Sequence, residues 1–163
     1  MPALSYPSPD FPALSGFTVD VPDHWRADPE SGVLFAVRPV ADIEGFMPNM
    51  VGSVRRAPQG ALQASVDEIN RRTTALANYE ELGRTHTTVG EHRAFHIEYS
   101  YRHTDTLTLA QMITIVEVDR GAVCDVVQIT ATCAGNQAQQ YWDDFRLMQA
   151  SLFIAPQGKN TNT

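Results

Sequence analysis

The feature that most constrains the fold is a run of four strand-like segments between Glu81 and Cys133. They are joined by three short turn signals, "VGE" at 89–91, "HTD" at 103–105 and "DRG" at 119–121. Connections this short can join only antiparallel neighbours, because a parallel pair needs a crossover of a dozen or more residues. The sequence therefore predicts a central antiparallel meander.

The third segment, from Leu107 to Val118, indicates how the sheet is covered. Its apolar residues fall on both alternating positions, with Leu109, Ile113 and Ile115 on one side and Met112, Val116 and Val118 on the other. A sheet that is apolar on both faces must be covered on both. We therefore expect helices on both faces.

Two amphipathic segments supply those helices. The first carries an apolar stripe at helical spacing, Leu62, Val66, Ile69, Thr73 and Leu76, and Ser65 with Glu68 has the spacing of a capping box. The second starts at an N-cap, Asn136, whose reciprocal partner is Gln139. Its apolar face consists of Ala138, Tyr141, Trp142, Phe145, Met148 and Leu152, while Asp143, Asp144 and Arg146 point away. The predicted fold class is an α/β (α+β) sandwich, a mainly antiparallel sheet with a central meander and helices on both faces.

The rest of the chain forms two ends and a set of short strands. A length of 163 residues fits one domain. Residues 1–16 form a proline-rich N-terminal arm, residues 17–155 a single domain and residues 156–163 a disordered tail. Within the domain, "GFTVDVP" and "GVLFAVRP" indicate strands that end at prolines, and "NMVGSVRRA" indicates a weaker third strand.

Charge and hydropathy restrict the partners and the location. The formal net charge of −7 disfavours nucleic acid, because phosphates require clustered Lys and Arg. The N-terminus lacks a positively charged start and an unbroken apolar run, and no stretch approaches the roughly 20 apolar residues that span a bilayer. We expect a cytoplasmic protein with neither a nucleic-acid nor a membrane partner.

The two cysteines, Cys124 and Cys133, fall in one predicted strand. Nine residues at about 3.3 Å each separate them by about 30 Å, which is too far for a disulfide. Neither has a basic neighbour that would make it reactive, so both are interpreted as small buried hydrophobes.

The stretch "GEHRAFHIEYSYRH" contains the densest group of reactive side chains, including His92 and His96. Phe95, Ile97, Tyr99 and Tyr101 alternate with Ala94, His96, Glu98 and Ser100, which is typical of a strand with a buried aromatic side. On a strand, His92 and His96 lie about 13 Å apart and cannot share a zinc ion as neighbours. The favoured interpretation of the polar side is a solvated or loop-covered sheet face.

A ligand site on this face is the alternative. His96 and Glu98 would lie about 7 Å apart, close enough to act on a substrate between them, and Ser100 continues the row. His86 of the preceding strand could join them, depending on register. These are candidate ligand-binding residues, and no residue is assigned as catalytic or as a metal ligand.

Other chemical signatures are absent from the sequence. It contains no G-x-S-x-G elbow, no Walker loop and no G-x-G-x-x-G after a strand. We therefore expect no cofactor and no bound transition metal, and enzymatic activity is not indicated.

Over about residues 16–155, the motifs "GFTVDVPDHW" and "PNMVGSV" are followed by the helix, the meander and the closing aromatic helix. This order resembles the PsbP-like fold group, which includes the actinobacterial LpqN-type domains, secretion-effector chaperones and a eukaryotic Ran-binding import factor. The resemblance implies members that mostly bind proteins and do not catalyse. LpqN-type members are typically exported lipoproteins, whereas this N-terminus shows no signal peptide and no lipid-attachment cysteine, so an envelope role is not carried over.

Two functional hypotheses follow. The first is a non-catalytic, cytoplasmic protein-binding module, an adaptor or chaperone-like protein whose partner is another polypeptide or a second copy in a homodimer. The apolar residues of the arm, Leu4, Tyr6, Phe11 and Leu14, support it as a clasp on a neighbouring chain. The alternative is a small-molecule-binding protein or minor hydrolase that uses His96 and Glu98.

Overall fold

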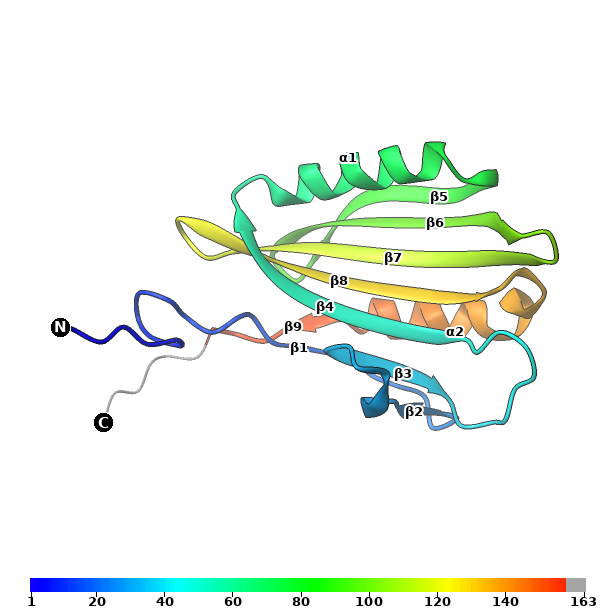
Figure 1. Cartoon of the computed structure of the whole chain (residues 1–163), viewed down its shortest axis with the longest axis horizontal. Coiled ribbons are helices and arrows are strands. Elements are labelled where there is room, and N and C mark those ends of the chain that lie inside the picture. The colour runs from blue at the N-terminus through cyan, green and yellow to red at the C-terminus, as the bar shows by residue number, and fades with distance from the viewer. Residues whose placement is uncertain (158–163) are drawn as a thin grey trace.

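The structure is a computed structural model that describes residues 1–157, and it consists of one large sheet, one small sheet and two helices (Figure 1). The strands are β1 (Phe17–Thr18), β2 (Trp25–Ala27), β3 (Phe35–Pro39), β4 (Asn49–Pro58), β5 (Ala77–Val89), β6 (His92–Thr104), β7 (Leu107–Asp119), β8 (Val123–Ala134) and β9 (Phe153–Ile154). The helices are α1 (Ala61–Thr74) and α2 (Ala138–Ala150), with short 3₁₀ turns at Pro29–Ser31 and Gly135–Gln137.

The large sheet has the strand order β2-β3-β4-β8-β7-β6-β5, and every neighbouring pair is antiparallel. Strands β5 to β8 are consecutive in sequence and in the sheet, so the predicted meander is confirmed. The turns that join them lie at the three predicted places, and Gly90 and Gly121 adopt the positive φ that tight turns require. Strands β1 and β9 pair with each other in the separate small sheet.

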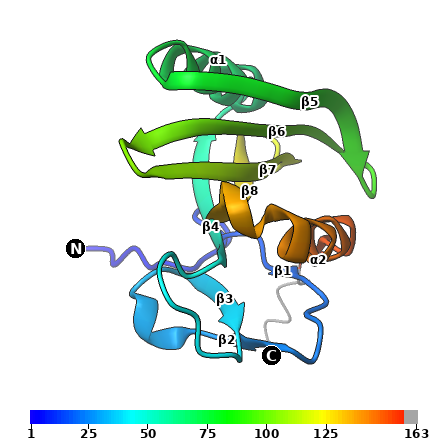
Figure 2. The ribbon, with the colours of Figure 1, turned by 90° about the vertical axis from the view of Figure 1, so that its right-hand side faces the viewer.

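The two helices cover opposite faces of the large sheet, as predicted (Figure 2). Helix α1 buries Leu62, Val66 and Ile69 against one face. Helix α2 buries Tyr141, Phe145 and Met148 against the other, together with Trp25. The predicted α+β sandwich, with a mainly antiparallel sheet and helices on both faces, is confirmed.

Strand β7 shows why both faces need a helix. Ile113 and Ile115 pack on the α1 side, whereas Met112, Val116 and Val118 pack on the α2 side. All five side chains are almost completely buried. The alternation along β6 is also confirmed, since Phe95, Ile97 and Tyr99 face α1.

The cysteines behave as predicted. Both lie in β8, both are free and both are fully buried. Burial raises the pKa of the Cys133 thiol to about 11, which keeps this side chain protonated and unreactive.

The predicted helix caps were wrong. Helix α1 is preceded by Gly60 in a left-handed conformation, and Ser65 lies inside the helix, where its hydroxyl donates to the carbonyl of Ala61. Helix α2 begins at Ala138, after a 3₁₀ turn in which the side chain of Gln137, rather than Asn136, accepts a hydrogen bond from the backbone of Ala134. The spacing of a capping box is common by chance in polar sequence. Here the turn that follows β4 places the start of α1 at Ala61, and the 3₁₀ turn that follows β8 places the start of α2 at Ala138.

Two side chains of α2 expected to point into solvent make tertiary contacts instead. Asp144 accepts hydrogen bonds from Trp25 Nε1 at 2.8 Å and from His24 Nε2 at 2.6 Å. Arg146 pairs with Glu98 of β6. Trp142 is half-buried at the border of the α2-side core and contacts Phe145 edge to face.

The early strands also differ from the prediction. Of the segment 16–22, only β1 is a strand, and it pairs with β9 rather than with the large sheet. The strand predicted to be weak, β4, is ten residues long and lies between β3 and β8. Two short strands, β2 and β9, have too few residues for a periodicity to be visible in the sequence.

The N-terminal arm, residues 1–16, forms neither helix nor strand and projects beyond the domain at its start (Figure 1). Of the predicted tail, Pro156 and Gln157 are described and exposed, and residues 158–163 lie outside the described part of the chain. The division into arm, domain and tail stays a prediction.

Candidate functional site

The polar side of β6 faces helix α2. His96 and Glu98 alternate with the buried Phe95 and Ile97, so both project toward the α2 side of the sheet. In the neighbouring strand β7, Thr114 lies directly opposite His96. The site is thus built from two central strands of the meander and the helix that covers them.

A chain of hydrogen bonds fixes the orientation of His96. Gln149 of α2 donates from Nε2 to the carbonyl oxygen of Met112 at 2.9 Å, and its Oε1 accepts the hydroxyl of Thr114 at 2.6 Å. The single hydroxyl proton of Thr114 is then used, so Thr114 Oγ1 acts as an acceptor toward His96 Nδ1 at 2.9 Å. His96 therefore donates from Nδ1, and this nitrogen is not available as a base.

Glu98 is bound on both carboxylate oxygens. Arg146 donates from Nε to Oε1 at 3.3 Å and from Nη2 to Oε2 at 3.2 Å. His96 Nε2 lies 3.3 Å from Oε1. Burial opposes ionisation of this carboxyl, but hydrogen bonds from Arg146 and His96 outweigh it and lower the pKa of Glu98. An ionised, doubly bound carboxylate is suited to holding its neighbours in place and is a poor general acid.

These residues line an open hollow of about 470 Å³ between β5, β6 and α2, which we call the His96 hollow. Thr85, Thr87 and Val89 of β5 form one wall, and Gln149, Ala150 and Leu152 form the α2 side. The volume lies in the range of small-ligand pockets, and the lining offers hydroxyl, imidazole and guanidinium groups for hydrogen bonding.

The structure brings together two of the three predicted ligand-binding residues. His96 and Glu98 are hydrogen-bonded neighbours, whereas Ser100 lies further along the same strand and does not line the hollow. His86 lies opposite Phe95 and contacts its ring, which places His86 on the α1 side, away from His96. A ligand at this site stays a prediction.

Sequence reasoning missed Thr114, Arg146 and Gln149. A signal was present for Gln149, because it lies four residues after Phe145 and therefore interrupts the apolar face of the helix with a polar side chain. Gln149 is 5% exposed, and such a buried amide requires hydrogen-bond partners. No local pattern indicated Thr114 or Arg146.

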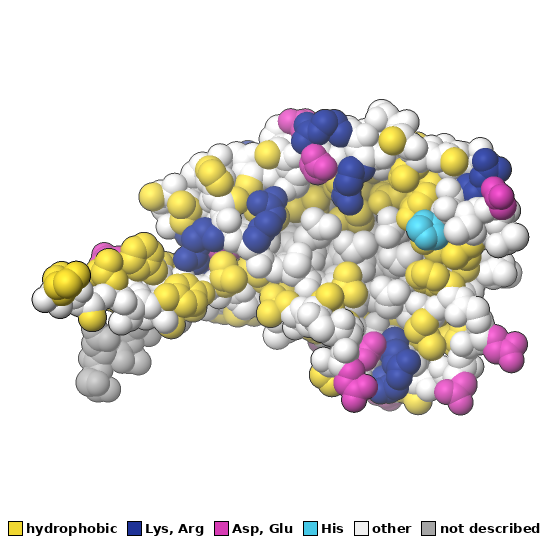
Figure 3. All heavy atoms as spheres, viewed as in Figure 1, with side chains coloured by type: hydrophobic (Ala, Val, Ile, Leu, Met, Phe, Trp, Pro, Cys, Tyr) yellow, Lys and Arg dark blue, Asp and Glu magenta, His cyan; other side chains and the backbone are white. Residues whose placement is uncertain are grey.

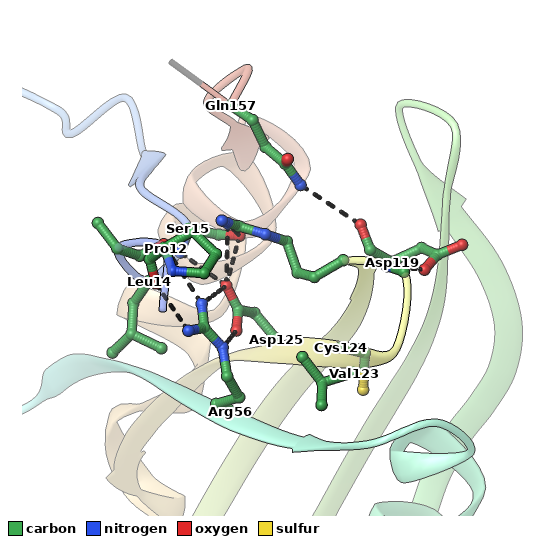
Figure 4. A network of polar contacts seen from close by, with 12 residues as sticks. Pro12, Leu14, Ser15, Arg56, Asp119, Val123, Cys124, Asp125 and Gln157 are labelled. Atoms are coloured by element: carbon green, nitrogen blue, oxygen red, sulfur yellow. Dashed lines mark hydrogen bonds and ion pairs between the residues drawn. The ribbon is translucent and has the colours of Figure 1, made fainter. Parts of the chain in front are cut away.

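A second polar cluster lies on strands β4 and β8, beside the turn between β7 and β8, and holds the N-terminal arm (Figure 4). It consists of Asp125 of β8, Arg56 of β4, Arg120 and Ser15, and we call it the Asp125 cluster. Asp125 is completely buried and accepts hydrogen bonds from Ser15 N and Ser15 Oγ, both at 2.8 Å. Arg56 Nε donates to it at 3.0 Å, and Arg120 Nη1 lies 3.3 Å from it.

The Asp125 cluster also binds the arm through hydrogen bonds to backbone carbonyls. Arg56 donates to the carbonyl oxygens of Pro12 at 2.7 Å and of Ala13 at 3.3 Å. Burial opposes ionisation of Asp125, but the hydrogen bonds from Arg56 and Ser15 outweigh it and lower the pKa of this carboxyl. The base of the arm is thereby fixed to the domain by charged and hydrogen-bonded groups.

Within residues 1–157, no three His, Cys, Asp or Glu side chains gather in a way that could hold a metal ion. Neither helix of the described chain is long and apolar enough to cross a membrane.

Among solved structures, the chain is similar to LpqN of Mycobacterium tuberculosis, described as involved in cell envelope biogenesis, with a TM-score of 0.71 over 93% of this chain and 88% of that one. It is also similar to cyanobacterial PsbP from Synechocystis, with a TM-score of 0.56 over 95% and 99% of the two chains. The chain has the PsbP-like fold.

The PsbP-like fold is shared at low sequence identity, which is 18% with LpqN and 11% with the cyanobacterial PsbP. The yeast Ran-binding protein Mog1p also matches, with a TM-score of 0.53 and 10% identity over 85% of this chain and 89% of that one. No protein-family model and no curated protein matches the chain by sequence. The likeness therefore establishes the fold and leaves the function to be argued from the residues.

Proposed function

We propose that this protein is a non-catalytic protein-binding module, an adaptor or chaperone-like protein, and that it binds another polypeptide through its N-terminal arm. The observation that carries the proposal is the contrast within the arm. Its base is fixed by the Asp125 cluster, while its apolar side chains are left exposed. The proposed location is the cytoplasm, which cell fractionation with an antibody to the native protein would test.

The exposed side chains of the arm are large and close together. Leu4 is 79% exposed, Tyr6 63% and Phe11 50%. Hydrophobic groups gather along this projection in the space-filling view (Figure 3). Burying one such side chain is worth about 1.5–3 kcal/mol, so the arm offers a partner several favourable contacts that the chain itself does not use.

The fixed base makes the arm a better binding element. Ordering a free peptide on binding costs roughly 1–2 kcal/mol per residue in backbone entropy. The Asp125 cluster already orders Pro12, Ala13 and Ser15, and a hydrogen bond from Leu14 N to Tyr6 Oη folds the next part of the arm back on itself. A partner therefore meets a segment whose conformational freedom is already reduced.

The chemistry of the His96 hollow also supports a non-catalytic role. His96 Nδ1 is a donor to Thr114, His96 Nε2 lies 3.3 Å from Glu98 Oε1, and Glu98 is held ionised by Arg146, so every polar atom of the two side chains already has a partner within the protein. Of the structurally similar proteins, Mog1p is named as a Ran-binding protein. A polypeptide partner for the present chain is consistent with that similarity.

Site-specific photo-crosslinking in the native host tests the proposal. A benzoylphenylalanine in place of Tyr6 should crosslink to a specific polypeptide, identifiable by mass spectrometry. The same reagent in place of Leu147, which is 66% exposed on α2, is the matched control and should not give that product. The double variant Leu4→Ser, Phe11→Ser should lose the crosslink while the fold, measured by circular dichroism, is unchanged. Equal crosslinking from positions 6 and 147, or none from either, would overturn the proposal.

The size and lining of the His96 hollow favour a second candidate, small-molecule binding, with a minor hydrolase as its catalytic form. Its test is a thermal-shift screen with small polar compounds, repeated with the Arg146→Gln and Thr85→Val variants. A compound that stabilises the native protein and neither variant would establish the hollow as a binding site. Turnover in a hydrolase screen that disappears in His96→Ala would identify an enzyme and reject the non-catalytic role.

A further inference from the structure

The two edges of the large sheet differ in how they are protected. The edge strand β2 has three residues, and short edge strands offer little for another chain to pair with. The other edge strand, β5, has thirteen residues and pairs with β6 along one side. Its other side pairs with no strand of the described residues, and nearly all of the strand's side chains are exposed.

The features of β5 that hinder pairing with another chain occur only in the first half of the strand. The pairing with β6 is interrupted between Ala77 and Glu80 and again between Glu81 and Gly83, and such irregularities twist an edge away from a partner. Charged side chains, Glu80 and Glu81, lie in the same half. Both features are devices that natural sheets use against edge-to-edge association.

The second half, Gly83–Val89, lacks these devices. Its register with β6 is continuous over all seven residues. It contains no proline and no lysine, and Thr85, Thr87 and Thr88 have the high strand propensity of β-branched residues. Its one charged side chain, Arg84, already pairs with Glu81 of the same chain. A regular and exposed edge, whose single charge is already paired, is suited to accepting another strand.

We propose that Gly83–Val89 pairs antiparallel with the same segment of a second copy of this chain, with the two-fold axis at His86, so that two seven-stranded sheets join into one. This inference goes beyond the proposed function and is independent of the N-terminal arm. It assigns one interface, the second half of β5, to the homodimer.

The residues are self-complementary in this register. With the axis at His86, Thr85 lies opposite Thr87 of the second copy, and Arg84 lies opposite Thr88. Pairs of threonines opposite each other are favourable in antiparallel sheets, and no two like charges face each other. A closed two-fold arrangement also uses up the edge, so association stops at two chains.

Charge sets the expected salt dependence. Each chain carries a formal net charge of −7, so two copies repel at long range, while the pairing segment itself contributes almost no repulsion. Salt screens the long-range term. Dimerisation should therefore strengthen as salt is added, in contrast to an interface held by opposite charges.

The test is sedimentation velocity of the full chain over a concentration series, with charges placed on the proposed axis. The variants His86→Lys and His86→Glu should each weaken the dimer roughly fivefold or more, because each places two like charges opposite each other. An equimolar mixture of the two should recover dimers, since the mixed pair places Lys opposite Glu. His103→Lys, which changes an exposed histidine of β6 outside the interface, is the matched control and should behave as the native protein does.

Circular dichroism checks that each variant is folded. Hydrogen exchange gives an independent measure, because amides within Gly83–Val89 should become more protected as concentration rises while those of Ala77–Glu81 do not. A native chain that stays monomeric throughout, a dimer equally strong in both His86 variants, or a mixture that recovers nothing would each overturn the inference. Protection of Gly83–Val89 by a different polypeptide, with the chain itself monomeric, would also reject the second copy as occupant.

Discussion

Replacing the buried carboxylate of Asp125 by an amide tests the arm anchor most directly. Asp125→Asn preserves the volume of the side chain but removes the negative charge that faces Arg56 and Arg120. Asp125 is completely buried and the Arg120 side chain is 7% exposed, so water cannot replace the lost carboxylate. Removing one partner of a buried ion pair costs about 3–5 kcal/mol.

That loss is a large fraction of the stability of a domain, which is about 5–15 kcal/mol. In urea denaturation followed by circular dichroism, a loss of about 4 kcal/mol lowers the midpoint by roughly 2 M for a typical slope. Asp143→Asn, the same chemical change at an exposed position of α2, is the control and should alter the free energy of unfolding by less than about 0.5 kcal/mol. The backbone amide of Ser15 should also lose its protection from hydrogen exchange in Asp125→Asn.

The effect of pH follows from the lowered pKa of Asp125 in the folded state. A carboxyl whose folded pKa lies below its unfolded value contributes stability above the unfolded pKa, and this contribution is lost as pH falls through the folded pKa. The difference in unfolding free energy between the native protein and Asp125→Asn should therefore shrink in acid. A variant within about 1 kcal/mol of the native protein at neutral pH would refute the reasoning, because it would mean that the guanidinium groups do not depend on this carboxylate.

Three further predictions concern the core and the His96 hollow. Phe145→Ala should cost about 3–5 kcal/mol in chemical denaturation, and Trp142→Ala should cost less, because Phe145 is fully buried and Trp142 is half-buried. Gly52→Ala should destabilise by about 1–3 kcal/mol, measured as a lower melting temperature, because a Cβ at position 52 would come within 2.7 Å of the Phe17 ring. Glu98→Gln should cost about 1–2 kcal/mol at neutral pH, since its partner Arg146 is largely exposed, and the difference should disappear as pH falls through the lowered pKa of Glu98.

Much of the fold could be predicted because it depends on local periodicity. A strand shows its period of two and a helix its period of 3.6 within a single segment, whatever lies beside it. The turns at Gly90 and Gly121 and the alternation around Phe95 were therefore visible in the sequence. The same reasoning placed His96 and Glu98 on one face, which the structure bears out.

The partners of those residues could not be predicted, because each comes from a distant part of the chain. Thr114 meets His96 through the register of β6 with β7, and a shift of one residue would have turned it to the other face. Register also decided that His86 lies on the opposite side of the sheet from His96.

The sequence by itself thus determined the elements, the meander and the need for a helix on each face. The tertiary structure alone decided which polar groups meet, and the Asp125 cluster is the clearest case. Ser15 and Asp125 are 110 residues apart in the chain, and neither residue carries a local pattern that indicates the other. The physical reason is that periodicity reports which side of an element is buried, whereas a hydrogen bond or ion pair depends on the relative placement of two elements to within a few tenths of an ångström.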